Sequence, residues 1–299
     1  MSIDKLRSEI DDIDSQLIDL FERRMHVALE VARCKRESGK PVFDNTRERQ
    51  LLHKVSGETD TELEVYVRVF FSMLMDLSRS YQHKFLADES SLRKKIEATI
   101  EQTPKLFPEK AVIACQGAEG AEGLAAQAAC DKLFATPSIM YFNTFEGVFK
   151  AVKSGLCRYG MLPIEHSTTG SANTIYDLMQ QYNASIVRAV RVQNTTADYT
   201  RFICISNELE IYPGATRTSL MMVIPHKPGS LYRVLVRFYA LGMNLVKHES
   251  RPIQGRNLDF MFYFDVEASI YSPALLQLIC ELENQTPDFR YLGSYTEIV

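Results

Sequence analysis

The stretch that decides the fold of the N-terminal region is IDKLRSEIDDIDSQLIDLFERRMHVALEVARCKRES, residues 3–38. Its apolar residues recur with the 3.6-residue period of one helical face, and Gly39 is the first glycine or proline after residue 2. The pattern predicts one long helix that Pro41 stops. The apolar positions are Ile3, Leu6, Ile10, Ile13, Leu17, Leu20, Phe21, Val27, Ala28, Val31 and Ala32.

Three basic side chains on this helix are candidates for anion binding. Arg24 and Lys35 are separated by close to three helical turns, so they share a face about 16 Å apart along the axis, a gap that two long side chains can bracket. Arg7 lies about 25 Å from Arg24 and cannot reach the same small ligand. Arg7 is therefore either a solvated surface charge or a contributor to the site of a second chain.

Two further predicted helices add polar groups. Asp44 can cap the second helix, on which Asp44, Arg47 and Glu48 fall at i, i+3 and i+4. A third helix is predicted from about residue 61 to 85, with Ser78 and Gln82 as an i, i+4 polar pair on an otherwise apolar segment. Basic, acidic and amide groups thus converge from three helices, and the ordinary alternative is a solvated charged face.

Residues 1–90 resemble the all-helical chorismate mutase domain. In that family two chains interlock into a six-helix dimer, and the first arginine crosses into the partner's site. The resemblance implies that Arg7 serves a second chain, in a homodimer or a higher homo-oligomer. The matching residues are Leu6-Arg7, Glu22-Arg23-Arg24, Lys35, Asp44-x-x-Arg47-Glu48-Arg49 and Ser78-x-x-x-Gln82.

The resemblance implies conversion of chorismate to prephenate, a one-substrate pericyclic rearrangement that needs no nucleophile, metal or cofactor. Such an enzyme holds a dicarboxylate in a near-attack shape and stabilises charge on the breaking ether oxygen. The implied roles are carboxylate clamping by Arg24 and the partner's Arg7, donation to the ether oxygen by Lys35 and Gln82, holding of the ring hydroxyl by Asp44 and Glu48, and further carboxylate contacts by Arg47 and Ser78.

Length and composition indicate a soluble multidomain protein. A chain of 299 residues predicts two or three domains, and 45% hydrophobic with 24% charged residues is ordinary globular composition. The net charge of −4 argues against nucleic-acid binding. No leader or membrane-spanning run is seen, so a cytoplasmic location without membrane association is expected. The six cysteines have no metal-ligand spacing and are expected to be buried and reduced.

After a charged, partly helical linker at residues 91–108, residues 109–207 alternate between strand and helix patterns, which predicts an α/β unit with a largely parallel sheet. This part resembles prephenate dehydratase, whose active site is a cleft between two periplasmic-binding-protein-like lobes and whose Thr-Arg-Phe threonine is catalytic. The matching runs are residues 145–149, 160–167, 170–172, 176–178 and 200–202.

The departures from that family predict an inactive lobe with a structural or relay role. The strand pattern at residues 185–192 leads within a few residues to Thr200, so the second lobe is missing. The turn at residues 117–123 lacks the family's hydroxyls, and His166 replaces an asparagine, as either a new acid–base group or a hydrogen-bonded filler. The alternative is residual dehydratase activity, in a cleft rebuilt by another protomer. Its candidate residues are Thr200, Arg201, Glu165 and His166.

Residues 216–299 show a βαββαβ pattern, typical of an α+β fold. They resemble an ACT regulatory domain of the dehydratase type, which implies a phenylalanine site between paired domains. The order of the three parts resembles the bifunctional chorismate mutase–prephenate dehydratase family. Two classes stay open: a phenylalanine-regulated mutase, and a sensing module that regulates a partner. The implied ligand residues are Gly229, Ser230 and Leu231, and Glu249, Ser250 and Arg251 of the Glu-Ser-Arg-Pro motif.

Overall fold

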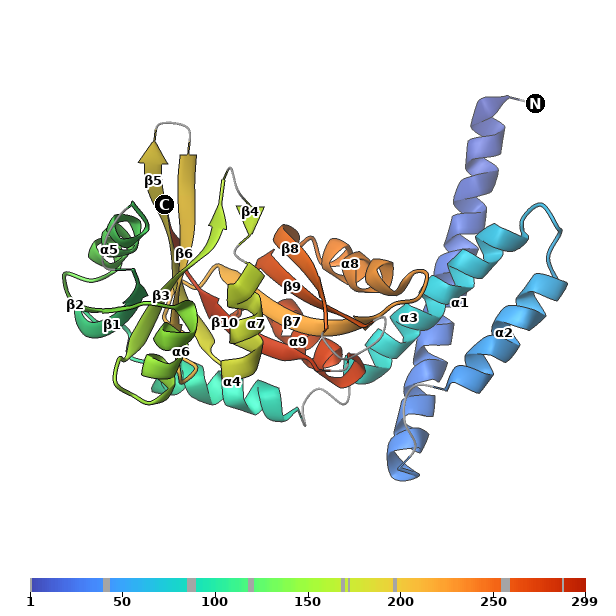
Figure 1. The fold of residues 1–299 in the computed structure, drawn as a ribbon. Coiled ribbons are helices and arrows are strands. Elements are labelled where there is room, and N and C mark those ends of the chain that lie inside the picture. The colour runs from blue at the N-terminus through green and yellow to red at the C-terminus, as the bar shows by residue number, and fades with distance from the viewer. Residues whose placement is uncertain are drawn as a thin grey trace. The chain divides into compact units, whose positions relative to one another are not determined.

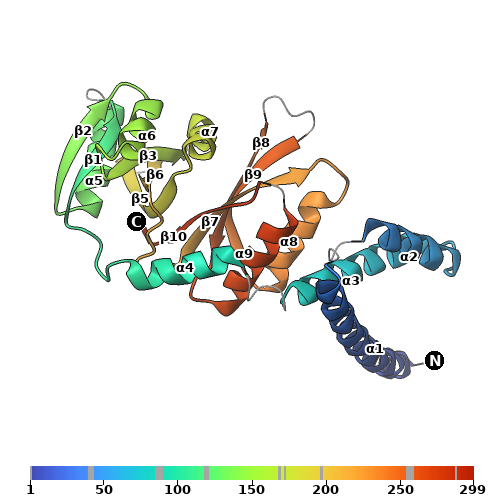
Figure 2. The same ribbon diagram turned by 90° about the horizontal axis from the view of Figure 1, so that it is seen from below.

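The computed structural model divides into two compact units, residues 1–90 and 91–299 (Figure 1). Figure 2 shows the same elements from below. The structure describes residues 2–39, 44–84, 90–117, 121–167, 170–171, 173–195, 198–253, 259–286 and 288–299.

The first unit consists of three helices, as predicted: α1 (Ile3–Glu37), α2 (Asn45–Gly57) and α3 (Glu64–Lys84). The predicted cap of the second helix is confirmed, because the Asp44 side chain accepts a hydrogen bond from the Arg47 backbone N–H at 3.0 Å. Pro41, the predicted helix stop, lies outside the described residues. The N-terminal half of α1 extends past α2 and α3 (Figure 1).

The helical unit buries few apolar side chains of its own. Those of α1 are Met25, Ala28, Leu29 and Ala32, all in its C-terminal half. The other predicted apolar positions of α1 are exposed, including Ile3 at 64% and Leu20 at 61%. The apolar stripe of α1 is thus real, but most of it has no covering partner among the described residues of this chain.

The second unit contains a seven-stranded sheet in the order β11-β5-β6-β3-β1-β2, with β4 paired to β3. The prediction of a largely parallel sheet was wrong. The pairs β1–β2, β1–β3 and β5–β11 are parallel, whereas β3–β4, β3–β6 and β5–β6 are antiparallel. The strands β5 and β6 follow one another too closely for a crossover helix, so they pair antiparallel. The bounds are β1 (Lys110–Gln116), α5 (Ala121–Leu133), β2 (Thr136–Phe142), α6 (Phe145–Lys153), β3 (Tyr159–His166), β4 (Gly170–Ser171), α7 (Asn173–Tyr182), β5 (Ser185–Thr195), β6 (Asp198–Ser206) and β11 (Glu297–Ile298).

The expected βαββαβ pattern is confirmed as a four-stranded antiparallel sheet in the order β10-β7-β9-β8. The segment expected as a linker contains α4 (Ser91–Gln102), whose Ile96 is fully buried and which lies beside α9 (Figure 2). The bounds are β7 (Arg217–Pro225), α8 (Ser230–Ala240), β8 (Asn244–Pro252), β9 (Asp259–Glu267), α9 (Pro273–Gln285) and β10 (Arg290–Tyr295).

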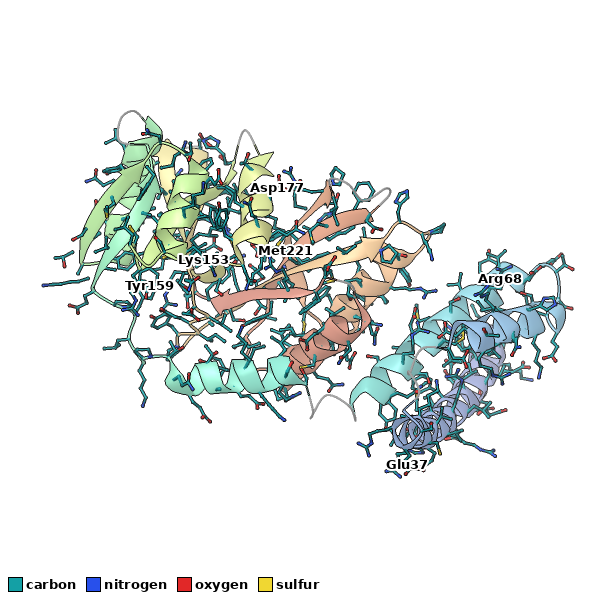
Figure 3. All side chains as sticks on the ribbon, turned by 60° about the horizontal axis from the view of Figure 1, so that its bottom comes forward. Glu37, Arg68, Lys153, Tyr159, Asp177 and Met221 are labelled. Carbon is teal, nitrogen blue, oxygen red and sulfur yellow. The ribbon has the colours of Figure 1, made fainter. Side chains whose placement is uncertain are left out.

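The two sheets share one hydrophobic core. Met221 of β7 and Met261 of β9 belong to the same buried cluster as Ile175 and Met179 of α7, and Figure 3 shows the packed side chains around Met221. Gly293 of β10 has φ +143°, and a Cβ there would lie 2.2 Å from the Ile186 carbonyl oxygen of β5. Glycine therefore allows β10 to touch β5, and the chain then adds β11 to the first sheet.

Five of the cysteines are buried, as expected, but Cys34 is exposed. The expectation was wrong there because Cys34 lies on the face of α1 that α2 and α3 leave uncovered.

A buried ion-pair network joins the two sheets, with Arg201 of β6 at its centre. Arg201 is 2% exposed and pairs with Asp265 of β9 and, at 2.9 Å, with Glu297 of β11. Glu297 also pairs with Arg191 at 2.9 Å and with Arg217 at 2.7 Å. Asp265 of the C-terminal sheet thus neutralises Arg201 of the α/β sheet, and Glu297 of the α/β sheet neutralises Arg217 of the C-terminal sheet, so ion pairs in both directions hold the two sheets in one unit.

Replacing Asp265 with Asn should flatten the acid limb of the pH–stability curve. Burial alone would raise the pKa of the Asp265 carboxyl, but the Arg201 charge and hydrogen bonds from Ser219 and Tyr263 outweigh it, so the folded pKa is lowered. Such a group stabilises the fold fully above its unfolded pKa of about 3.9, and this contribution is lost as the pH falls through the folded pKa. At pH 7 the variant should lose about 3 kcal/mol, because Arg201 loses a buried partner.

Urea denaturation between about pH 2 and about pH 7 measures both effects. Glu267→Gln, which removes an exposed carboxylate from the same strand, is the matched control and should keep the acid limb of the wild type. An Asp265→Asn curve as steep in acid as the wild-type curve would contradict the lowered pKa.

Candidate active site

The helical unit contains a cavity of about 370 Å³ whose walls come from all three helices. Seven of the eight residues predicted for this site line it. Arg7 does not; it lies near Asp4, at 3.9 Å, on an exposed part of α1. The predicted residues in the wall are Arg24, Lys35, Asp44, Arg47, Glu48, Ser78 and Gln82, and the others are Val27, Ala28, Val31, Leu51, Met75 and Arg79.

Helical spacing explains why these side chains meet. Arg24 and Lys35 are three turns apart on α1, and the cap at Asp44 brings the first turn of α2 to the same cavity. Ser78 and Gln82 are one turn apart on α3, with Gln82 Nε2 lying 3.4 Å from Ser78 Oγ. Gln82 Oε1 is buried and has no hydrogen-bond partner among the described residues. Turning this amide over would let Ser78 donate to Oε1 and leave Nε2 free to donate into the cavity.

The charge in the wall favours an anionic ligand. Four cationic side chains and two carboxylates line the cavity. Arg24 is held by donating to the Leu74 carbonyl at 3.3 Å, and burial lowers the pKa of its guanidinium, which nevertheless stays charged at neutral pH. The positive balance suits a small molecule with two carboxylates.

Arg79 is the functional candidate that sequence reasoning missed. It is 8% exposed, and its two terminal nitrogens donate to Glu48 of α2 and to Asp76 one turn earlier on α3. It therefore fixes a carboxylate of the cavity wall across two helices. The i, i+3 spacing of Asp76 and Arg79 on an apolar helix was the available signal.

The four candidate residues for a dehydratase site lie in the second unit, and two of them are bound to the C-terminal sheet. Arg201 is enclosed by its buried ion pairs, and Glu165 pairs with Lys247 of β8 at 3.2 Å. Thr200 is a buried strand residue next to Arg201. His166 Nε2 lies 3.4 Å from Asp198 Oδ2, so a carboxylate faces it. The turn at 117–123, expected to have lost its hydroxyls, falls partly outside the described residues.

The six candidate residues for a phenylalanine site are divided between two places. Glu249 and Arg251 line a cavity between α7 and the strands β8 and β9. Ser250 lies between them on β8, so strand alternation turns it to the opposite face, where it is exposed. Gly229, in a left-handed conformation with φ 80°, leads into Ser230 and Leu231 at the start of α8.

Among the described residues, no three or more His, Cys, Asp or Glu side chains are grouped so that they could hold a metal ion. Within the same residues, no helix combines the length and apolar character that crossing a membrane requires.

Two family models match the chain and define its class. Residues 6–83 match chorismate mutase type II, and residues 113–195 match prephenate dehydratase. The chain therefore carries a helical chorismate mutase domain followed by an α/β region of the prephenate dehydratase kind.

The same order occurs in named relatives. The bifunctional chorismate mutase/prephenate dehydratase of Enterobacter agglomerans is 23% identical over 379 aligned positions, which cover 97% of this chain and 95% of that protein. The corresponding protein of Aquifex aeolicus is also 23% identical, with 97% of each chain covered. The chain is a relative of these bifunctional proteins along nearly its whole length. Because it has 299 residues, at least 80 of the 379 positions hold no residue of this chain.

Solved structures resemble the second unit. GqqA, described as a novel type of quorum quenching acylase, is 27% identical with a TM-score of 0.55, covering 62% of this chain and 94% of that chain. Prephenate dehydratase from Streptococcus mutans is 24% identical with a TM-score of 0.54, covering 63% and 99%. Prephenate dehydratase from Arthrobacter aurescens, solved in complex with L-Phe, is 18% identical with a TM-score of 0.53, covering 62% and 90%. The two dehydratases share the fold.

Replacing Arg79 with Met should destabilise the helical unit, because two largely buried carboxylates lose their shared cation. The expected loss is about 3 kcal/mol in the free energy of unfolding, measured by urea denaturation. Arg68→Met on the same helix is the control. Arg68 is 58% exposed and faces Glu64 at 3.8 Å, so its loss should cost under about 0.5 kcal/mol. Equal effects of the two changes would contradict the role assigned to Arg79.

Proposed function

We propose that the chain is a chorismate mutase that converts chorismate to prephenate in the cavity of the helical unit. The observation that carries this proposal is the convergence of Arg24, Lys35, Arg47 and Glu48 with an amide and a hydroxyl on one cavity of about 370 Å³. The match of residues 6–83 to the chorismate mutase family and the names of the relatives support it.

The rearrangement of chorismate requires only that the enzyme position the substrate and stabilise the charge that develops in the transition state. Arg24 and Arg47 would bind the substrate carboxylates, since a guanidinium donates two parallel hydrogen bonds to a carboxylate. Lys35 and the Gln82 amide would donate to the ether oxygen, on which negative charge grows as its bond breaks. Bracketing both ends of the substrate favours the folded near-attack shape from which the new bond forms.

The remaining polar groups would fix the ring. Asp44 and Glu48 would accept a hydrogen bond from the ring hydroxyl, and Ser78 would complete the carboxylate contacts. Arg79 would keep Glu48 in place, because it ties that carboxylate to Asp76 of α3. All these donors and acceptors are held by helices, which limits their motion before the substrate binds.

A second copy of the chain would complete the site. Besides the exposed apolar residues of α1, α3 exposes Val69 at 55% and Phe70 at 52%, so the unit exposes large apolar side chains on two of its helices. Pairing of two such units would bury this surface. It would also bring the partner's Arg7 to a site that its own chain cannot reach.

We propose that the dehydratase-like region is catalytically inactive. Arg201 is 2% exposed and enclosed by ion pairs, so it cannot contact a substrate, and Lys247 neutralises Glu165. The 80 or more missing alignment positions support the loss of the second lobe of the cleft. One lobe cannot enclose prephenate and exclude water. The region would instead serve as a platform for the βαββαβ unit.

The βαββαβ unit would act as an ACT-type sensor of phenylalanine. Strand β8 lies at the edge of its sheet, so two copies could pair there. The exposed Ser250 and the turn at Gly229 and Ser230 would contribute to a ligand site between them. The L-Phe complex of the Arthrobacter aurescens dehydratase supports this class of ligand.

A complementation experiment tests the shared mutase site. Arg7→Ala and Lys35→Ala chains should each be nearly inactive, and Lys35→Ala should lose about 3 kcal/mol of transition-state stabilisation. Mixing them should restore one intact site per heterodimer, or about a quarter of wild-type activity at equal mixing. Prephenate formation from chorismate is the measurement.

The control is a mixture of Arg24→Ala and Lys35→Ala chains. Both residues line the cavity of the same chain, so no heterodimer has an intact site and no activity should return. Recovery in the control mixture, or its absence in the Arg7→Ala and Lys35→Ala mixture, would contradict the shared site. Inactivity of the wild-type chain would reject the mutase and favour the sensing module.

If the dehydratase-like region is inactive, prephenate incubated with the protein at neutral pH should give phenylpyruvate no faster than prephenate does spontaneously without the protein. Separate chromatographic measurement of the two compounds decides this. Turnover above background that Thr200→Ala abolishes would show that the shortened region is still an enzyme.

A further inference from the structure

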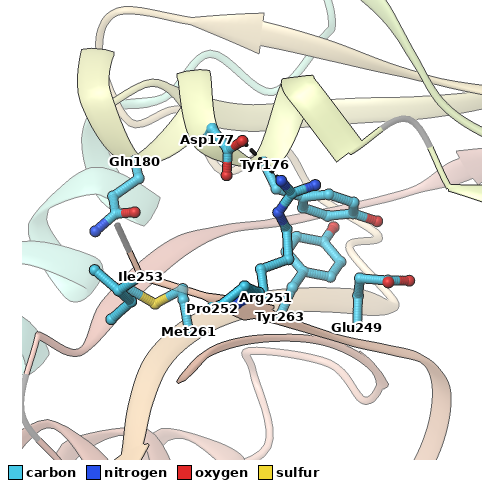
Figure 4. A pocket seen from close by; sticks show the side chains of 9 residues that line it. All are labelled: Tyr176, Asp177, Gln180, Glu249, Arg251, Pro252, Ile253, Met261 and Tyr263. Atoms are coloured by element: carbon cyan, nitrogen blue, oxygen red, sulfur yellow. Dashed lines mark hydrogen bonds and ion pairs between the residues drawn. The ribbon is translucent and has the colours of Figure 1, made fainter. Parts of the chain in front are cut away.

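A small polar cavity of about 200 Å³ lies in the second unit, beside the helix α4. Segments that are distant in the sequence form its wall: α4, the last residue of α6, the junction of α7 and β5, residues 207–209 after β6, and β10. It shares no lining residue with the cavity between α7 and the strands β8 and β9 that Figure 4 shows. Six polar side chains in its wall are those of Lys95, Lys153, Asn183, Ser185, Asn207 and Glu208.

Two lysines line this cavity without a counter-charge of their own. Among the described residues, Lys95 of α4 and Lys153 at the end of α6 have no ion-pair partner, whereas Lys150, one turn before Lys153, pairs with Glu146 at 3.0 Å. The sequence explains this difference, because no carboxylate stands three or four residues from Lys95 or Lys153. Two ammonium groups from separate elements therefore reach one cavity with their charge uncompensated.

The junction of α7 and β5 adds neutral donors that are held in place. Asn183 has a left-handed backbone, with φ 55°, which asparagine tolerates better than most residues. Its Oδ1 accepts a hydrogen bond from Arg290 Nη2, so its Nδ2 is left to donate elsewhere. Arg290 also donates to the carbonyl oxygens of residues 179 and 180 at 3.2 and 2.6 Å, which offsets the negative end of α7. Two residues further, Ser185 adds a hydroxyl group to the wall.

One carboxylate also lines the cavity. Glu208 accepts a hydrogen bond from the Asn207 amide at 2.8 Å and, among the described residues, forms no ion pair with either lysine. Two ammonium groups and one carboxylate leave this wall with a net positive charge. The cavity therefore favours an anion, and Glu208 is available to accept a hydrogen bond from a hydroxyl group of the same ligand.

We propose that this cavity binds a phosphate group, carried either by inorganic phosphate or by a small hydroxylated phosphate monoester. Lysine ammonium groups are point charges that suit a tetrahedral anion, whose oxygens would accept from donors on α4, α6 and the α7–β5 junction. A planar carboxylate is bound best by the fork of an arginine, and no arginine is among the described residues that line this cavity. The hydroxyl groups of an ester would lie toward Glu208 and Asn207.

A ligand in this cavity would connect α4 to α6 and to the start of β5. Since α4 is the first element after the helical unit in the sequence, the ligand would stabilise the segment that leads into the second unit. The inference goes beyond the proposed mutase and does not depend on it, because none of the lining residues belongs to the helical unit.

Phosphorus NMR titration of the full chain with inorganic phosphate and with glycerol 3-phosphate tests this site, at about 0.15 M ionic strength, where loose surface attraction is screened. Both probes should bind, and Lys95→Met and Lys153→Met should each weaken binding about tenfold or more by removing a charged donor. Glu208→Gln should act in the opposite direction and strengthen the binding of inorganic phosphate a few-fold, because it removes a repelling charge. Succinate, whose carboxylates are planar, should compete poorly with phosphate.

Lys94→Met is the matched control, because it removes the same charge from the neighbouring exposed position of α4 and should leave binding unchanged. Wild-type affinity in both Lys95→Met and Lys153→Met, or an equal loss in Lys94→Met, would overturn the inference. Competition by succinate as strong as that by phosphate would do the same. Binding that is lost only in an Arg24→Ala, Lys35→Ala double variant would place the anion in the helical unit and contradict the assignment.

The two probes also distinguish the source of the phosphate group. Tighter binding of glycerol 3-phosphate would identify an ester as the ligand, whereas tighter binding of inorganic phosphate would identify the free anion, and either order supports the site. Absence of binding of both probes up to about 10 mM would overturn the inference without affecting the mutase.

Discussion

The architecture of the second unit depends on the buried charge of Arg201. A guanidinium at 2% exposure is stable only with full compensation. Its counter-charges are Asp265 of the C-terminal sheet and Glu297 of β11, the edge strand of the α/β sheet. The α/β sheet therefore cannot separate from the C-terminal sheet without uncovering a charge. The residue that resembles part of a dehydratase motif has become part of a junction. We propose that this one interaction both closes the dehydratase-like region and attaches the C-terminal sheet rigidly to it.

The helical unit follows the opposite principle, because its charges line an open cavity. Arg24, Lys35 and Arg47 line this cavity, and Arg79 pairs with Glu48 and Asp76 of the protein itself. Most of the apolar stripe of α1 is likewise left exposed by the described residues of its own chain. The proposed function would explain both features by a bound substrate and a second chain.

Local rules predicted much of this molecule and failed where distant segments meet. The 3.6-residue period of α1, the Asp44 cap and the alternating strands of the βαββαβ unit depend on near neighbours and were foreseen. The mixed sheet was not foreseen, because the pairing of β6 with β3 and β5 depends on the path of the chain and not on local sequence. The sequence also could not show that Asp265 pairs with Arg201, which lies 64 residues earlier. Nor could it show that Arg251 faces α7 while Ser250, its neighbour on β8, points to the opposite face of the strand. Arg79 was missed because one buried arginine on an apolar helix looks like a surface charge until its two carboxylates are seen.

The central claim is that the chain has one site for prephenate, in the helical unit, and that the dehydratase-like region is closed to it. Equilibrium binding of prephenate to the full chain, measured by calorimetry, tests this most directly. We expect one site per chain, lost in an Arg24→Ala, Lys35→Ala double variant. A second site that survives in this variant and disappears when Thr200→Ala is added would contradict the claim.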